Sequence, residues 1–381
     1  MGHMKYEHTK PYEDWFWEKN RIDLKRAYVE KINTDQKELL LSGGSKMSYD
    51  KLVIASGSKP NKFGWPGQDL DGVQGLYSYQ DLELLEKNTA TLPKRAVIVG
   101  GGLIGIEFAE MLHSRHIPVT LLVRESSFWN NVLPEGESAL VNRHILEHGF
   151  DLRLGVNLGE IIDDGNGRAK GVTIKETGEK INCQLVGLTA GVSPSINFLK
   201  ESNIELDRGV LVNLHQETNV PDVYAAGDCA QFHEPVAGRR PTEQVWYTGK
   251  IQGQVVAQNI CGEKTTYDPG HWFNSAKFLD IEYQTYGWVF PKLKDNETNF
   301  YWEHPDGKKC LHFVWDATTE EFIGLNTFGI RLRHEIFDRF LRDKSTITHV
   351  LENLKAANFD PEFYKVHEAD IITKFNQKTG K

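Results

Sequence analysis

The chain has 381 residues, too many for one hydrophobic core, and its 39% hydrophobic and 25% charged residues are typical of a globular protein of two or three domains. Its net charge of −9, with Lys and Arg scattered among acidic residues, disfavours nucleic acid as a partner, because phosphate binding needs clustered basic residues. The longest nearly apolar run, 96–106, contains four glycines and is much shorter than the roughly 20 residues that cross a bilayer. No signal-peptide apolar region follows Met1. We therefore expect no membrane partner and a cytoplasmic protein.

In chain order, the first feature is a segment that occurs twice. Residues 22–60 are predicted to form short strands, a glycine turn, another strand and a small-residue turn that ends at Pro60. Residues 150–194 repeat this plan, with Gly191 in the second small-residue turn and Gly57 in the first. An internal repeat of this length indicates that the two copies are the same half of two related dinucleotide-binding domains.

The spacing between the repeats also bears on where the first domain begins. The glycine motif at Gly100 lies 51 residues before Asp151, and the same spacing from Asp23 would place a matching motif about 28 residues before Met1. We therefore expect the chain to start inside its first domain. We also expect it to bind FAD weakly or not at all, and binding to return when about 50 upstream residues are added.

Between the two copies the pattern predicts a strand at 96–99, a glycine turn, a helix to about His116 and a strand at 119–123. The turn carries Gly100-x-Gly102-x-x-Gly105 in the strand–turn–helix context that makes this motif a strong signal for a bound nucleotide. The first glycine permits the turn, the second lets a pyrophosphate approach, and the third packs helix on strand. Leu103 and Ile104, which open the helix, are candidate cofactor contacts with the glycines because free N–H groups there bind phosphate.

Three charged residues near this motif are further candidates. Glu107 either favours the positive end of the helix dipole or accepts a hydrogen bond from the nicotinamide amide. Arg124 follows the second strand and favours NADPH, because a guanidinium binds the 2′-phosphate. Glu125 lies about 20 residues after Gly105, where the acid that binds the ribose of NADH is expected, so NADH is the other candidate. A solvated charge pair is the alternative for both, so the choice between NADH and NADPH stays open.

After the second copy, residues 223–226 form an apolar strand that ends in Gly227 and Asp228, and a helix is predicted from about Glu243 to Ile260. The small residues let a ligand approach, and Asp228 either accepts hydrogen bonds from sugar-like hydroxyls or caps a turn. Beyond Tyr267 the aromatic content rises and a third domain of mixed α and β structure is expected. The cysteines are far apart, so neither a redox pair nor a metal site is predicted: Cys183, Cys229, Cys261 and Cys310.

Three motifs in this order resemble the FAD-dependent pyridine nucleotide-disulfide oxidoreductase superfamily: residues 49–57, the glycine motif at Gly100, and residues 218–228. The chain looks most like the flavin-only branch of ferredoxin, rubredoxin and nitrite reductase flavoprotein components, over about residues 20–265. Its first FAD fingerprint is absent, and with it any catalytic cysteine of the disulfide-reducing branches.

This resemblance implies roles for particular residues. Ala55, Ser56 and Gly57 would lie against FAD, with Ser56 in place of the family's usual Thr. Asp228 would hold the ribityl chain of FAD and Glu107 would lie near the nicotinamide. Trp246 resembles the position beside the flavin ring, and a core aromatic is its alternative.

The resulting prediction is an α/β fold with two related dinucleotide-binding domains, the first incomplete, and an α+β C-terminal domain. The domains are expected at 1–92 (partial FAD-binding), 93–198 (NAD(P)-binding), 199–265 (returning FAD-binding) and 266–381 (C-terminal interface). The function is hydride transfer from NAD(P)H to FAD and electron transfer to an unidentified acceptor, for which no side chain is an obvious acid, base or nucleophile.

Two other functions remain open: a disulfide or peroxide reductase with its cysteine in a missing segment, and a noncatalytic nucleotide-binding fragment. The expected partners are the nucleotide cofactors, with an electron-acceptor protein and a homodimer also open.

Overall fold

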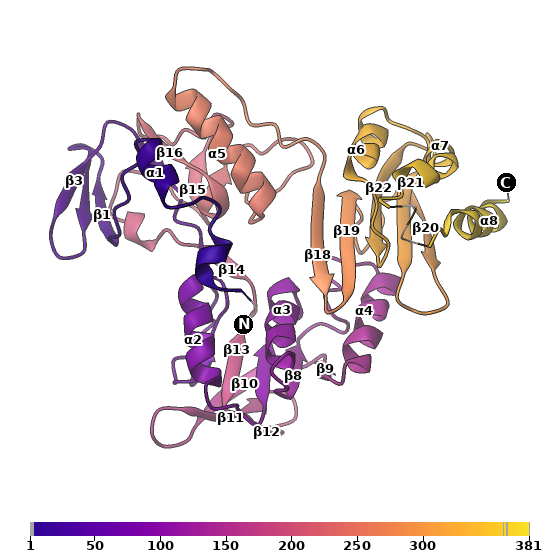
Figure 1. Cartoon of the computed structure of the whole chain (residues 1–381), viewed down its shortest axis with the longest axis horizontal. Helices are drawn as coiled ribbons and strands as arrows, with labels where there is room; N and C mark the ends of the chain where they lie inside the picture. The colour runs from indigo at the N-terminus through magenta and orange to yellow at the C-terminus, as the bar shows by residue number, and fades with distance from the viewer. Residues whose placement is uncertain (1–3, 361, 363–364, 381) are drawn as a thin grey trace. The chain divides into compact units, whose positions relative to one another are not determined.

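The structure is a computed structural model that describes residues 4–360, 362 and 365–380. It divides into two compact units (Figure 1): unit 1 contains Met1–Pro60 and Val192–Pro269, and unit 2 contains Asn61–Gly191 and Gly270–Lys381. Each unit combines helices with parallel and antiparallel strands, which confirms the mixed α/β class. In the described part of the chain, no helix has both the length and the apolar character that crossing a membrane requires.

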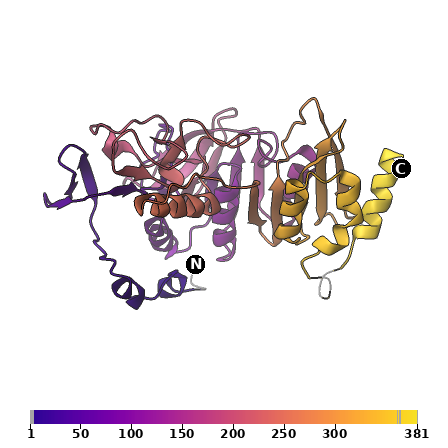
Figure 2. The same ribbon diagram turned by 90° about the horizontal axis from the view of Figure 1, so that it is seen from above.

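Unit 1 is built on short strands around a main core and a smaller hydrophobic cluster. Its core contains Ile54, Val223 and Ala225, with Leu199 and Val255 packed against them. The N-terminal helices η1 and α1 bury no residue, and Figure 2 shows them set apart from the strands of the unit. The elements are η1 (Tyr6–Thr9), α1 (Trp15–Lys19), β1 (Val29–Asn33), β2 (Glu38–Leu41), β3 (Lys46–Ser48), β4 (Leu52–Ile54), β5 (Ser58–Pro60), β14 (Val192–Pro194), η2 (Asn197–Leu199), β15 (Val210–Val212), β16 (Val223–Ala225), η3 (Gly227–Cys229), β17 (Ala230–Phe232) and α5 (Trp246–Ile260).

Unit 2 begins with the glycine-turn part of the chain. Its parallel sheet has the strand order β6-β13-β7-β8-β9, and β7 is completely buried between β13 and β8. Parallel strands buried on both faces read as continuous apolar runs, which is why 96–99 and 119–123 were predictable. The elements are β6 (Val73–Gln74), α2 (Tyr79–Thr89), β7 (Ala96–Val99), α3 (Leu103–His113), β8 (Val119–Val123), α4 (Glu135–Glu147), β9 (Asp151–Leu154), β10 (Leu158–Asp163), β11 (Ala169–Ile174), β12 (Lys180–Asn182) and β13 (Leu185–Leu188).

The internal repeat is confirmed as a repeated topology. A three-stranded antiparallel sheet, β1-β2-β3 in the first copy and β10-β11-β12 in the second, leads into one parallel strand, β4 or β13. The strands that end the copies, β5 and β14, pair with each other, so that Ser58 lies opposite Pro194. One expectation is wrong: residues 22–25 form no strand, although the matching β9 does. The reason is that β9 has β8 as a hydrogen-bonded neighbour, whereas residues 22–25 have no strand beside them.

Two predicted helices are shorter than expected. Helix α3 ends at His113 rather than about His116, because His116 has a left-handed φ of 59°. Helix α5 begins at Trp246 rather than about Glu243, because Val245 is still extended.

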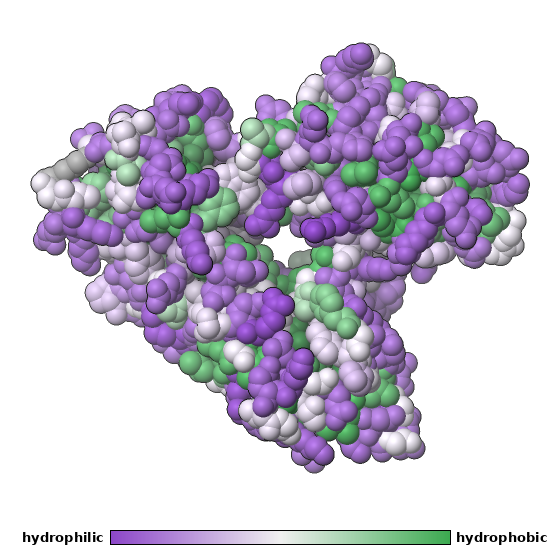
Figure 3. All heavy atoms as spheres, turned by 180° about the vertical axis from the view of Figure 1, so that it is seen from behind, coloured by the Kyte–Doolittle hydropathy of each residue, from purple (hydrophilic) through white to green (hydrophobic). Residues whose placement is uncertain are grey.

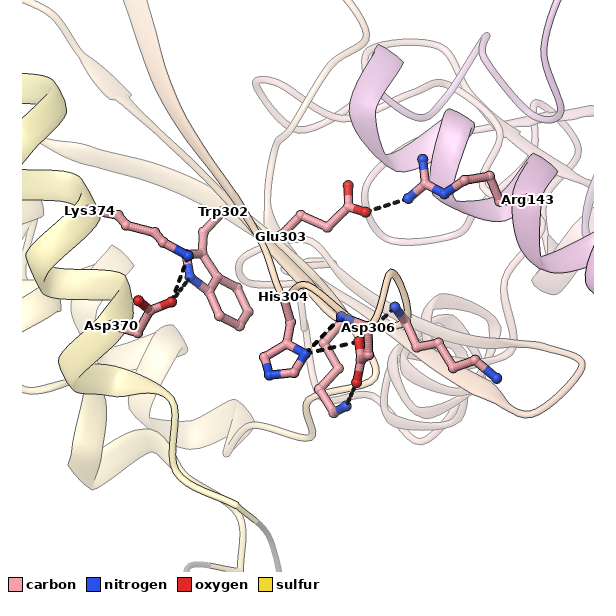
Figure 4. A network of polar contacts seen from close by, with 9 residues as sticks. Arg143, Trp302, Glu303, His304, Asp306, Asp370 and Lys374 are labelled. Carbon is pink, nitrogen blue, oxygen red and sulfur yellow. Dashed lines mark hydrogen bonds and ion pairs between the residues drawn. The ribbon is translucent and has the colours of Figure 1, made fainter.

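The C-terminal part of unit 2 has the expected mixed α and β content. Its antiparallel sheet has the order β18-β19-β22-β21-β20, and the helices after it share a core with Trp302 and Phe313. Asp370 of α8 accepts a hydrogen bond from Trp302 Nε1 at 2.7 Å, which ties α8 to β20 (Figure 4). The elements are β18 (Phe273–Phe278), β19 (Ile281–Gly287), β20 (Glu297–Glu303), β21 (Cys310–Asp316), β22 (Phe322–Phe328), α6 (His334–Arg342), α7 (Ile347–Glu352), η4 (Leu354–Ala357) and α8 (Glu368–Thr379).

Helix α4 connects the two parts of unit 2. Arg143 of α4 forms an ion pair with Glu303 of β20 (Figure 4). Glu137, fully buried, accepts a hydrogen bond from Asn326 Nδ2 at 2.8 Å, and its other oxygen lies 2.9 Å from His312 Nδ1. A side chain at Gly136 would come within 2.8 Å of the Tyr301 ring, so the helix and the sheet are in close contact there. The four predicted domain ranges stay a prediction, because this division into units does not test them.

Candidate functional site

The first candidate site is the glycine turn between β7 and α3. The turn follows the carboxyl end of β7, where the Gly100 N–H donates to Leu122 O at 2.9 Å. Helix α3 then begins at Leu103, with Gly102 as its N-cap and no side chain capping it. The first N–H groups of a helix have no acceptor within the helix, so this uncapped end can bind an anion. Leu103 and Ile104, the first two helical residues, are both partly exposed.

The three motif glycines have different surroundings. A Cβ at Gly100 would lie 2.6 Å from Thr189 O, and one at Gly105 would lie 2.5 Å from Gly100 O. At Gly102, by contrast, the nearest side-chain or backbone atom would be Trp129 Cδ1 at 4.0 Å. Protein packing thus requires glycine at 100 and 105 but leaves space at 102, which suits a ligand that approaches the backbone there.

Two neighbouring residues of this turn were not singled out by the sequence. Gly101 is needed because a Cβ there would be 2.5 Å from Val123 Cγ1. Thr189 donates to Val99 O at 3.0 Å and closes the turn from the β13 side. The run of three glycines is a sequence signal for Gly101. No sequence signal marks Thr189, because its role depends on the pairing of β13 with β7.

Gly191 lies in the loop that follows β13, at the same carboxyl edge of the sheet. It has a left-handed φ of 82°, and its carbonyl oxygen accepts the Asn61 N–H at 3.1 Å. A Cβ at Gly191 would lie 3.3 Å from Asn61 Nδ2. The structure therefore brings Gly191 to the edge of the sheet that carries the glycine turn.

The charged candidates near α3 and β8 have different surroundings. The Arg124 side chain is 75% exposed and donates to Glu125 Oε1 through Nη2 at 2.7 Å and Nε at 3.1 Å. The two residues thus form a surface charge pair, which was one of the alternatives. Glu107 reaches solvent on α3, yet partial burial, together with the Glu110 charge, raises its pKa.

The second candidate site, in unit 1, follows two adjacent parallel strands. β4 and β16 pair so that Ile54 lies opposite Ala225, and the Ala226 N–H donates to Ile54 O at 3.0 Å. The turns that follow these strands therefore meet at one edge: Ala55, Ser56 and Gly57 after β4, and Gly227 and Asp228 after β16. Ligands of open α/β sheets bind outside the carboxyl ends of the strands, which is this edge.

Hydrogen bonds fix both turns. Ser56 Oγ donates to Ser195 O at 2.8 Å, and the Ser195 N–H donates to Gly57 O at 2.9 Å. Gly57 and Gly227 have φ values of 66° and 77°, in the region that favours glycine. The Gly227 N–H donates to Gln252 Oε1 of α5 at 2.6 Å, so Gln252 is a positioning residue that the sequence did not reveal. Ala55 and Ser56 are exposed, and Asp228 is partly buried.

Helix α5 begins beside the second turn. A Cβ at Gly249, in the first turn of the helix, would lie 3.4 Å from Gly227 Cα. Trp246 opens the helix and is 71% exposed, so it is not a core aromatic; Lys250 Nζ lies 5.3 Å from its ring centroid. Unit 1 also shows a hydrophobic patch, at the upper right of Figure 3.

Unit 1 also has a cavity of about 720 Å³. The residues that line it are close in sequence to these turns, but the turn residues themselves do not line it. Residues of β14 and the segment before α5 line it, including Pro194 and Gln244, and Gln244 Nε2 donates to Ser58 Oγ at 2.7 Å. In that segment Arg239 and Glu243 form a buried pair with two contacts of 2.7 Å.

Known proteins resemble this chain in sequence and in fold. It is 26% identical over 370 residues, or 96% of its length, to the assimilatory nitrate reductase electron transfer subunit of Bacillus subtilis, of which it covers 46%. It is 32% identical over 256 residues, or 67% of its length, to NADH-rubredoxin oxidoreductase of Clostridium acetobutylicum, of which it covers 60%. The chain thus spans roughly half of the length of these curated relatives.

The fold comparison agrees with the sequence comparison. The structure of a covalent putidaredoxin reductase–putidaredoxin complex matches with a TM-score of 0.77 and 21% identity, covering 98% of this chain and 86% of that one. The family model described as pyridine nucleotide-disulphide oxidoreductase matches residues 9–258, well over half of the chain. The chain therefore belongs to the pyridine nucleotide-disulphide oxidoreductase family, whose cofactors are FAD and NAD(P)H.

Proposed function

We propose that this chain is an oxidoreductase that binds NAD(P)H in unit 2 and FAD, weakly, in unit 1, and that electrons pass from NAD(P)H through FAD to an acceptor. The observation that carries the proposal is the room left at Gly102, beside an uncapped helix start, in a turn whose other glycines are required by packing. Gly102 is partly exposed, so the space beside it is open to a ligand from solution.

In unit 2 the residues of this chain would bind and orient the nucleotide. The N–H groups at the start of α3 hold its pyrophosphate against Gly102. Glu107, one turn further along, would accept a hydrogen bond from the nicotinamide amide, and Arg124 would bind a 2′-phosphate once it leaves Glu125. Glu125 is the alternative partner, for the ribose of NADH, so this proposal covers both nucleotides.

In unit 1 the two turns at the ends of β4 and β16 would hold FAD. The Asp228 carboxylate accepts hydrogen bonds from ribityl hydroxyls, Ala55, Ser56, Gly57 and Gly227 let the cofactor approach the backbone, and Trp246 offers an exposed aromatic face. When bound, FAD supplies the hydride-accepting and electron-transferring chemistry. The remaining task of the protein is to position both nucleotides.

The names of the relatives support an electron-carrier protein as the acceptor. One is an NADH-rubredoxin oxidoreductase, one is an electron transfer subunit of nitrate reductase, and a solved relative is a complex with putidaredoxin. The disulfide-reductase alternative gains no support from the cysteines, all four of which are free and three of which are buried.

The proposal is tested by nucleotide-dependent flavin reduction. The full chain, mixed with excess FAD under anaerobic conditions, is given NADH or NADPH while the visible absorbance of oxidised flavin is recorded. Flavin bleaching that is faster than in a protein-free mixture, and that slows in the Gly102→Ala variant, supports the proposal. If the bleaching rate equals that of the protein-free mixture at saturating FAD, this chain does not have the proposed activity.

A further inference from the structure

Two histidines and an aspartate converge in unit 2, and none of them belongs to the glycine turn or to its neighbouring candidates. His144 and His148 stand four residues apart at the end of α4, which places them on one face of the helix. Asp280 lies in the tight turn between β18 and β19, whose ends pair Phe278 with Ile281. His144 Nε2 lies 2.5 Å and His148 Nε2 3.3 Å from Asp280 Oδ1.

His144 is the buried member of this cluster. Its side chain is 2% exposed, and neither ring nitrogen has a hydrogen bond of acceptable geometry. A buried polar atom without a partner costs free energy, so it is uncommon in a folded protein and calls for an explanation. His144 Nε2 faces the Asp280 carboxylate, and a cation bound by both groups would give this nitrogen the partner that it lacks.

The hydrogen bonding of His148 supports the same conclusion. Its Nδ1 lies 2.9 Å from the carbonyl oxygen of His144, and since a carbonyl can only accept, Nδ1 carries a hydrogen. In the neutral ring Nε2 then has a free lone pair, and it is Nε2 that lies toward Asp280. Metal-bound histidines characteristically donate their other ring N–H to a carbonyl or carboxylate in this way.

We propose that His144, His148 and Asp280 form a binding site for a single divalent transition-metal ion of the zinc class. Two imidazoles and one carboxylate are a typical ligand set for zinc, whose bonds to nitrogen and oxygen are about 2.0–2.2 Å long. The ligand atoms all lie within 4.8 Å of one another, so an ion can reach all three after a small movement of Asp280. That side chain is 63% exposed, so it is free to move and leaves a route for the ion and for water as a further ligand.

The bound ion would join two parts of unit 2. Helix α4 already contacts the C-terminal sheet through Arg143 and Glu303 (Figure 4). The metal would add a further connection, from the last turn of α4 to the β18–β19 turn. Glu147 Oε2 lies 3.9 Å from His144 Nδ1, and Lys308 Nζ lies 3.9 Å from Glu147, so the charges around the ligands nearly cancel. The site therefore gains its affinity from direct ligation rather than from a field of acidic residues.

The experiment uses the full chain, freed of metal with a chelator, and titrates it with Zn²⁺ by calorimetry. One ion per chain is expected. His148→Gln and Asp280→Asn should each weaken Zn²⁺ binding at least tenfold, on the order of what the loss of a ligand-orienting contact alone costs. Co²⁺ added in place of Zn²⁺ should give visible d–d bands that both variants lose.

His349→Gln is the matched control, because His349 is an exposed histidine of α7, outside the cluster. It should bind Zn²⁺ as the parent chain does. Far-UV circular dichroism of each metal-free variant checks that it is folded, and Asp280→Asn keeps the size of an exposed side chain. The proposal is wrong if the parent chain binds no ion saturably, if both ligand variants keep its affinity, or if His349→Gln weakens binding equally.

Discussion

A Cβ atom added to Gly105 would lie 2.5 Å from the carbonyl oxygen of Gly100, so α3 can pack on the turn before it only when residue 105 is glycine. Gly102, three residues earlier, has no such contact, and its φ of −125° suits any residue. The same motif therefore contains two glycines that the fold needs, Gly100 and Gly105, and one that the proposed ligand needs, Gly102. This difference separates the effects of two substitutions that would otherwise seem equivalent.

We expect Gly102→Ala to weaken NAD(P)H binding at least tenfold and to change the melting temperature little, because the new methyl group occupies space reserved for the pyrophosphate. Gly105→Ala should instead destabilise the fold by roughly 1–3 kcal/mol, the usual cost of overpacking. Nucleotide titration and thermal unfolding of both variants measure the two effects. Unchanged affinity in Gly102→Ala would remove the nucleotide from this turn.

The second prediction concerns the choice of nucleotide. Arg124→Ala should weaken NADPH binding more than NADH binding, because only NADPH has a 2′-phosphate with which the guanidinium can pair. Charge-assisted hydrogen bonds of about 1.5–3 kcal/mol correspond to roughly a tenfold to hundredfold difference. Glu125→Gln, which releases Arg124 from its present partner, should shift the preference the other way. Equal losses for both nucleotides in Arg124→Ala would exclude Arg124 from this role.

Much of the secondary structure of unit 2 was predictable, because it depends on short stretches of neighbouring residues. The strands at 96–99 and 119–123 agree with the structure because buried parallel strands are continuous apolar runs, and the glycine turn between them has a strict spacing. The start of α5 was missed by three residues because nothing in the sequence shows that Val245 stays extended.

Contacts between distant segments could not be predicted. Residues 22–25 match β9 in pattern, yet a strand also needs a neighbour, and which neighbour is present depends on tertiary structure. The spacing of His144 and His148 was visible as His-x-x-x-His, but no metal site was expected, because only the fold brings the β18–β19 turn to them. Likewise, the role of Gln252 depends on how α5 packs beside Gly227.

The third prediction concerns thiol reactivity. Burial raises the pKa of Cys183 to about 12 and also raises the pKa values of Cys229 and Cys310, so these thiols stay protonated at pH 8. Cys261 is the exposed cysteine. A thiol reagent at pH 8 should therefore modify Cys261 rapidly in the native chain and all four cysteines after denaturation. Cys261→Ser should abolish the rapid phase, and a rapid phase that persists would show that one of the buried thiols is accessible.

The fourth prediction tests the buried contact of α4 with the C-terminal sheet. Glu137→Ala should lower the free energy of unfolding by roughly 3 kcal/mol, because Asn326 and His312 would lose their buried partner. Glu137→Gln keeps an acceptor for Asn326 and should cost less. Urea denaturation of the three proteins gives the comparison. If Glu137→Ala unfolds at the urea concentration of the parent chain, the contact contributes no stability.

The last prediction concerns Trp246, which stands 71% exposed at the start of α5, beside Gly227. An exposed indole gains free energy when a flat ring covers it, and aromatic pairs are worth about 0.5–1.5 kcal/mol beyond the area that they bury. We therefore expect FAD to quench the fluorescence of Trp246 and Trp246→Ala to weaken FAD binding roughly threefold to tenfold. Trp246→Phe, which keeps an aromatic face, should retain most of the affinity. Trp15 is also exposed but lies in α1, outside both turns, so Trp15→Phe is the control and should leave quenching unchanged. Equal quenching by FAD in the parent chain and in Trp246→Phe would mean that the flavin does not lie against this residue.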